Sequence, residues 1–137
     1  MGYPVAKISC EEMTMDYSQL SDFEINKRVS EVIYKDRNGL FVARNLPSKE
    51  GVTIVAEVNS EYICIAAADY CNNPADAWPI ITENNISIIL DNPSMPCATD
   101  NARELFDDAG PNVGVAYDNP LRAAMIVFLM MQDVNNA

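Results

Sequence analysis

The sequence contains twenty acidic residues, four cysteines and one tryptophan, but no histidine. Histidine is the commonest general base and proton shuttle in enzymes, and it activates serine and cysteine nucleophiles. Its absence excludes hydrolases of the Ser-His and Cys-His types. Carboxylate pairs could still carry acid–base catalysis, with or without a divalent metal, although twenty acids guarantee that some lie close together by chance.

Acidic and amide side chains gather in one glycine-containing segment, residues 107–118. Its oxygen ligands, which would suit calcium, are Asp107, Asp108, Asn112 and Asp118. The spacing departs from that of a calcium-binding loop, because the third and fifth positions counted from Asp107 are Ala109 and Pro111, and the twelfth is an aspartate. We therefore expect a solvated acidic loop here and no resident metal.

The four cysteines are separated by 54, 7 and 26 residues: Cys10, Cys64, Cys71 and Cys97. These separations contain no pair spaced for a zinc knuckle. The five glycines are scattered, and no phosphate-binding G-x-x-x-x-G-K motif is present. We expect reduced thiols and no cofactor.

Trp78, the only tryptophan, lies in a cluster of aromatic residues and prolines formed with Tyr70, Pro74 and Pro79. One interpretation is a small satellite core packed over a sheet. The other is a surface that docks a partner protein, because tryptophan and tyrosine dominate the binding energy of such surfaces. The exposure of the Trp78 ring distinguishes the two.

The net charge of −11 is unevenly distributed. Residues 1–50 carry eight acids and seven bases, whereas residues 51–137 carry twelve acids and only two bases, Arg103 and Arg122. Direct nucleic-acid binding is disfavoured, because lysine and arginine supply most of that affinity. Binding to an anionic membrane is disfavoured for the same reason.

Length and composition predict one globular domain. The chain has 137 residues, of which 49% are hydrophobic and 21% charged. Residues 1–14 show no periodicity and no secretory apolar region, so we expect a loose tail before a single domain spanning 15–137, in a cytoplasmic protein.

The segment 120–132, PLRAAMIVFLMMQ, is the element around which the domain must be organised. It is apolar on every side, so a helix here must be buried all round. It is too short to span a membrane, which needs roughly 20 apolar residues. Asn119 and Pro120 are typical of an N-cap and a first helical position.

A second helix is predicted from Asp22 to about Tyr34. Ser21 and Glu24 form a capping box, and apolar residues follow with helical spacing at positions 25, 29, 32 and 33. Three antiparallel strands are then predicted at 40–44, 52–58 and 62–67.

The region 73–119 is predicted to contain less regular structure. A short helix begins at Asn73-Pro74, and Pro79 interrupts it and moves Trp78 out of helical geometry unless a new turn starts at the proline. The apolar run Ile86–Leu90 predicts a fourth strand in a central position. Residues 91–100 and 107–119 are expected to be loops, with a short helix capped by Asp100 and ending at Phe106 between them. The resulting fold is α+β: a mostly antiparallel sheet of about four strands packed against the apolar C-terminal helix and the amphipathic N-terminal helix.

The segment from Asn73 to Ile81 (NPADAWPII), the strand Ile86-Ser87-Ile88 and the closing segment from Asn119 to Met125 (NPLRAAM) together resemble the NinX-like proteins of lambdoid phages and prophages. The resemblance runs from about Met15 to the end. That family carries no established catalytic residues. The resemblance therefore implies origin and compartment: a phage or prophage product in the bacterial cytoplasm.

The sequence favours a small non-enzymatic accessory protein that modulates a host or phage protein. Two alternatives stay open: an enzyme that uses carboxylates or a metal, and an acidic protein that mimics DNA in a basic cleft. Self-association is also left open.

Overall fold

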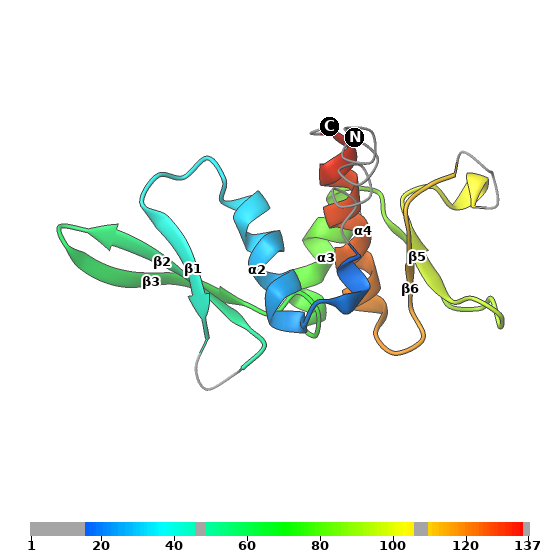
Figure 1. The fold of residues 1–137 in the computed structure, drawn as a ribbon, viewed down its shortest axis with the longest axis horizontal. Helices are drawn as coiled ribbons and strands as arrows, with labels where there is room; N and C mark the ends of the chain where they lie inside the picture. The colour runs from blue at the N-terminus through cyan, green and yellow to red at the C-terminus, as the bar shows by residue number, and fades with distance from the viewer. Residues whose placement is uncertain (1–15, 46–48, 106–109, 136–137) are drawn as a thin grey trace, which may run out of the picture.

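The computed structural model describes residues 16–45, 49–105 and 110–135. These residues form an α+β fold, and within them lie three α-helices, two short 3₁₀ helices and six strands. The strands form two separate three-stranded antiparallel sheets, with orders β1-β2-β3 and β4-β5-β6. We call them sheet A and sheet B. Figure 1 shows them on opposite sides of the helices. The α+β class is confirmed, whereas one sheet of about four strands is replaced by two of three.

Sheet A contains the three predicted strands: β1 (Leu40–Arg44), β2 (Val52–Val58) and β3 (Glu61–Ala68). Asn59 and Ser60 join β2 to β3, both with positive φ of 54° and 69°. Two consecutive positive values match a tight hairpin turn. β3 carries an extra residue opposite Ile54 and Val55, a β-bulge.

Sheet B is where the sequence prediction failed most. It consists of β4 (Ser87–Ile89), β5 (Cys97–Thr99) and β6 (Val113–Val115). The predicted fourth strand lies at the edge of the sheet and not at its centre. β5 and β6 lie in segments predicted to be loops. Three-residue strands are too short to show alternation, so their pairing is decided by tertiary contacts.

The helix α4 (Pro120–Asn135) is the core of the molecule, as its sequence predicts, and extends three residues beyond the predicted end. Every residue from Ala123 to Leu129 is buried. α4 packs against α2 (Asp22–Ile33), α3 (Pro74–Glu83), β5 and β6. Asn119 caps it, because its Oδ1 accepts from the backbone N–H groups of Leu121 and Arg122. The predicted Ser21 cap of α2 is also present.

Two helix boundaries differ from the prediction. α3 runs through Pro79 without interruption from Pro74 to Glu83, so Trp78 keeps helical geometry. The proline sits at the sixth helical position, where it costs one hydrogen bond with the preceding turn. The short helix expected after Asp100 is a 3₁₀ helix, η2 (Ala102–Glu104), capped by Asn101.

Some predictions concern residues outside the described part of the chain. The expected tail at residues 1–14 is one of them, and a further 3₁₀ helix, η1 (Tyr17–Gln19), which the sequence did not indicate, begins the described part.

Candidate docking groove

Trp78 lies on the outer side of α3, with 61% of its surface exposed. Helical periodicity turns Ala77, Ile80 and Ile81 into the core, so that Trp78 and Pro79 face outward. The Oγ1 of Thr82 donates to the Trp78 carbonyl at 3.1 Å and to the Pro79 carbonyl at 3.2 Å. These bonds support the backbone of the turn that carries the exposed ring.

Trp78 also lines an open groove of about 510 Å³ between α3 and β4. The other lining residues are Ile81, Thr82, Asn85, Ile86, Ser87 and Ile88. The groove therefore combines an aromatic ring and isoleucine side chains with a few polar groups. β4 is an edge strand, so the groove lies beside backbone that only β5 pairs within the sheet. Asn85, with φ of 55°, makes the sharp turn from α3 into β4.

The structure divides the predicted aromatic and proline cluster. Pro74, Trp78 and Pro79 are exposed, whereas Tyr70 is buried in the core. The Tyr70 hydroxyl accepts a hydrogen bond from the Oγ of Ser30 at 3.3 Å. Burial raises the pKa of Tyr70. Tyr70 is therefore a core residue and does not share a surface with Trp78.

The predicted acidic loop is described only in part. Asp107 and Asp108 lie outside the described residues, while Asp118 is exposed. The backbone N–H and the Nδ2 of Asn112 donate to the carboxylate of Asp100 at 2.9 and 3.0 Å. Within the described ranges, no group of three or more Cys, Asp and Glu side chains could hold a metal ion.

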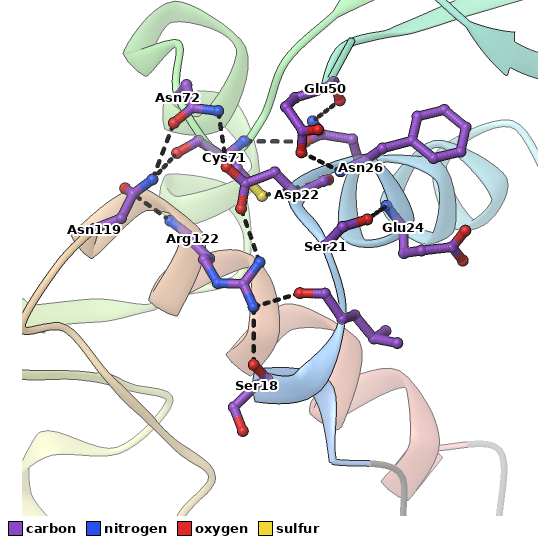
Figure 2. A network of polar contacts seen from close by, with 12 residues as sticks. Ser18, Ser21, Asp22, Glu24, Asn26, Glu50, Cys71, Asn72, Asn119 and Arg122 are labelled. Carbon is purple, nitrogen blue, oxygen red and sulfur yellow. Dashed lines mark hydrogen bonds and ion pairs between the residues drawn. The ribbon is translucent and has the colours of Figure 1, made fainter.

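A polar junction, absent from the sequence predictions, joins the starts of α2 and α4 (Figure 2). The guanidinium of Arg122 forms an ion pair with Asp22 at 2.8 Å. It also donates to the backbone carbonyls of Ser18 and Leu20, at 3.2 and 2.7 Å. Asn119 reaches the loop before α3, because its Nδ2 donates to the Cys71 carbonyl at 2.7 Å.

Asn26 extends the polar junction into the interior, where it is fully buried. Its Nδ2 donates to the carbonyl of Glu50 at 2.7 Å and to Asp69 at 2.9 Å. Its Oδ1 accepts from the backbone N–H of Cys71 at 3.0 Å. These bonds fix α2 to both ends of the β2–β3 hairpin. The polar junction is therefore an architectural feature, since its side chains are held by backbone groups and by each other.

A second hollow, of about 430 Å³, lies between η1, β6 and the first turns of α4. Its lining includes Tyr17, Tyr117, Asp118, Arg122 and Ile126. Arg122 is its one basic lining residue, and the guanidinium already pairs with Asp22 in the polar junction. Among the described residues, by contrast, Trp78 forms no ion pair and its ring is exposed beside its groove.

None of the helices in the described part of the chain is long and apolar enough to cross a membrane.

Comparison with known proteins supports the sequence resemblance. A family model described as "Bacteriophage P22, NinX" matches residues 16–132. No curated protein and no solved structure matches the chain. The match covers α2, α3 and most of α4, together with both sheets. The chain belongs to the bacteriophage P22 NinX family.

Proposed function

We propose that this phage accessory protein is a non-enzymatic interaction protein that modulates a host or phage protein in the bacterial cytoplasm. The observation that carries the proposal is the exposure of Trp78 beside an open, largely aliphatic groove. Tryptophan is the residue type most enriched at the energetic centres of protein interfaces. A ring that is 61% exposed contributes little to the core and is accessible to a partner.

The groove indicates the chemistry of its partner. Trp78 and the half-buried Ile88 offer an apolar surface for an aliphatic or aromatic side chain, whereas Ile86 is almost fully buried. Thr82, Asn85 and Ser87 offer hydroxyl and amide groups for the backbone that carries those side chains. We infer that the occupant is an exposed segment of a folded protein with an apolar anchor residue.

The test compares two variants that each remove one exposed aromatic ring. Trp78→Ala empties the proposed site, and Tyr117→Ala removes a ring that is 62% exposed on another part of the surface. The full chain captures partners from a host lysate, and the captured protein is then titrated against each purified variant. Loss of a central aromatic residue costs ~2 kcal/mol or more, so we expect Trp78→Ala to weaken binding by about 30-fold or more.

Tyr117→Ala is the control with which the binding of Trp78→Ala is compared. Tyr117→Ala should bind like the parent chain. Trp78→Ala should keep the parent's urea midpoint, whereas Tyr117→Ala should lower it slightly, because the Tyr117 hydroxyl donates to the Ser94 carbonyl. A partner that binds Trp78→Ala as tightly as the parent would contradict the proposal. A partner that is basic and dissociates as salt rises would instead favour the acidic surface, whose net charge of −11 makes DNA mimicry the competing function.

A further inference from the structure

A third pocket, which we call the β1 pocket, lies between the end of α2 and the strand β1 of sheet A. Its volume is about 280 Å³. Leu40, Val42 and Ile54 form its apolar floor, and Ser30 and Tyr34 stand beside them. Val42 and Ile54 are direct partners across β1 and β2, so their side chains share one face of the sheet. α2 packs against both of these strands.

The β1 pocket also reaches the edge of sheet A. Three consecutive residues of β1 line it: Leu40, Phe41 and Val42. Side chains alternate between the two faces of a strand, so three neighbours can border one pocket only where the strand has a free side. In the described part of the chain, β1 pairs with β2 alone. The other side of β1 is therefore a free edge that borders the pocket.

The backbone of β1 offers hydrogen-bonding groups at this edge. The backbone N–H of Glu57 donates to the Gly39 carbonyl at 3.0 Å, one residue before β1 begins. Hydrogen-bonded pairs alternate along an antiparallel ladder, so the odd-numbered residues of β1 bond to β2. The even-numbered residues Leu40 and Val42 direct their N–H and C=O groups toward the free edge. Their side chains line the pocket, so the edge and the pocket can bind one chain together.

Two cationic side chains, Lys35 and Arg37, line the same pocket. Both are exposed, and among the described residues neither side chain has a hydrogen-bond or ion-pair partner. The acid that lines the pocket, Glu31, pairs with Lys27 at 3.3 Å. Lys35 and Arg37 belong to the turn that leads into β1, so they lie at the Leu40 end of the free edge. The β1 pocket therefore attracts negative charge.

We propose that the free edge of β1 binds an extended acidic segment of a partner protein, which adds a fourth strand to sheet A. The edge bonds to the backbone of the segment, the pocket takes one apolar side chain, and Lys35 and Arg37 bind an acidic one. The net charge of −11 opposes an acidic partner only at long range. Charges farther apart than about 8 Å are largely screened at physiological ionic strength, so the two nearby cations decide the contact.

The geometry sets the spacing of side chains in the segment. Sheet A is antiparallel throughout, and antiparallel pairing is the more stable kind, so the segment runs antiparallel to β1. Residues directly opposite each other share a face, so the residue opposite Val42 places its side chain in the pocket. The residue two positions closer to the segment's C-terminus lies opposite Leu40, beside Lys35 and Arg37. We expect an apolar residue followed two positions later by an acidic one.

The first test varies the peptide. The probe is a dye-labelled peptide, Thr-Leu-Thr-Leu-Thr-Glu-Thr, and its fluorescence anisotropy with the full chain measures the dissociation constant. Replacing its glutamate by lysine should weaken binding at least ~10-fold, because like charges then meet. N-methylation of the second leucine removes the N–H that bonds to Val42 and should weaken binding at least ~10-fold. N-methylation of the threonine after that leucine should have little effect, because this N–H points away from β1.

The second test varies the protein with a matched pair of substitutions. Arg37→Glu and Arg103→Glu change the net charge equally, but Arg103 is exposed in η2, between β5 and β6 in the sequence. Arg37→Glu should weaken binding of the peptide at least ~10-fold, whereas Arg103→Glu should weaken it by about twofold at most. Both residues are exposed, so both variants should keep the parent's urea midpoint.

Four outcomes would overturn the proposal. A parent chain that does not bind the probe at any attainable concentration is the first. Equal weakening by the two arginine variants would show that only net charge matters. Equal binding of the two N-methylated peptides would show that no strand is added. Loss of the probe from Trp78→Ala would place the peptide in the groove beside Trp78 and not at β1.

This inference is independent of the function proposed for that groove. Trp78→Ala should bind the probe like the parent, so a failure of the groove proposal leaves the β1 pocket untouched. Conversely, Arg37→Glu should retain the partner captured through Trp78.

Discussion

The two sheets show how differently this chain treats similar strands. In sheet B, every residue of β5 is buried, and α4 packs against β5 and β6. In sheet A, the strands are longer and at least as apolar, yet Phe41, Tyr62, Ile63 and Ile65 are all between 45% and 67% exposed. Strand hydrophobicity therefore does not tell whether the chain itself supplies the cover. Whether a helix lies opposite the strand decides it, as α4 does for β5 and β6.

The sharpest way to test this difference is to remove one side chain from each region. Met125 on α4 is fully buried, so Met125→Ala removes apolar contacts and leaves a cavity. Such changes cost ~2–5 kcal/mol. Tyr62→Ala on sheet A should lower the free energy of unfolding by only about 1 kcal/mol, because the ring is 67% exposed and its aromatic contact is with Phe41 alone. Urea unfolding measures both, and comparable losses would show that the Tyr62 ring is packed as tightly as Met125.

Asn26 tests the connection between sheet A and the helices. Asn26→Leu keeps the volume but leaves the Cys71 N–H and the Glu50 carbonyl without their side-chain partner. Each buried polar group left unpaired costs ~1–3 kcal/mol, so we expect a loss of ~2–4 kcal/mol. Amide hydrogen exchange should then speed up at residues 69–73 more than in β5. Unchanged exchange in that loop would contradict the role assigned to Asn26.

Two glycines offer a matched pair, one beside each sheet. A Cβ at Gly114 in β6 would lie 2.6 Å from the carbonyl oxygen of Ala123, inside α4. Because backbone cannot move aside cheaply, Gly114→Ala should cost ~1–3 kcal/mol by overpacking. Gly39 precedes β1 with φ of 81°, and a Cβ there has room, its nearest neighbour lying 3.8 Å away.

Gly39→Ala should therefore lower the free energy of unfolding by only about 1 kcal/mol, the cost of holding a residue with a Cβ in a left-handed backbone conformation. Thermal unfolding should rank the two variants in that order. A larger effect at Gly39 would mean that sheet A is packed more tightly than its exposure indicates.

Changes at the cysteines should have the smallest effect on stability, and that effect should depend on pH. Cys64 on sheet A is exposed, whereas Cys97 and Cys71 are buried, and burial raises the pKa of both thiols. A maleimide should label Cys64 rapidly and the other two only after unfolding. A raised folded pKa means that stability is complete below the unfolded value of 9.0 and declines as pH rises above it. Cys71→Ala should flatten that alkaline decline, and labelling of Cys71 in folded protein would contradict its burial.

The sequence predicted the elements with strong local signals. The capping residues Ser21 and Asn119, the first proline of the last helix and the strands of sheet A lie where their patterns placed them. Of sheet B, the sequence predicted β4, whereas β5 and β6 were missed because strands of three residues carry no periodicity. The run through Pro79 was missed because packing of Ala77, Ile80 and Ile81 outweighs one lost hydrogen bond.

The candidate groove was predicted only in part. The composition around Trp78 indicated either core or docking surface, and the structure separated the buried Tyr70 from the exposed Trp78. The groove itself needed β4 beside α3, a relation between segments that no local pattern expresses. The polar junction was equally hidden, because Arg122 meets Asp22 across 100 residues of chain.

By itself, the sequence determined the α+β class, the buried C-terminal helix and the phage family. Local capping energies and an all-round apolar helix allow few other arrangements. Tertiary structure alone decided which apolar strands the chain covers. α4 is a single helix of 16 residues and can shield only the strands within its reach, which are those of sheet B. Phe41 and Tyr62 of sheet A stay exposed, because burial is a property of what lies opposite a residue and not of the residue itself.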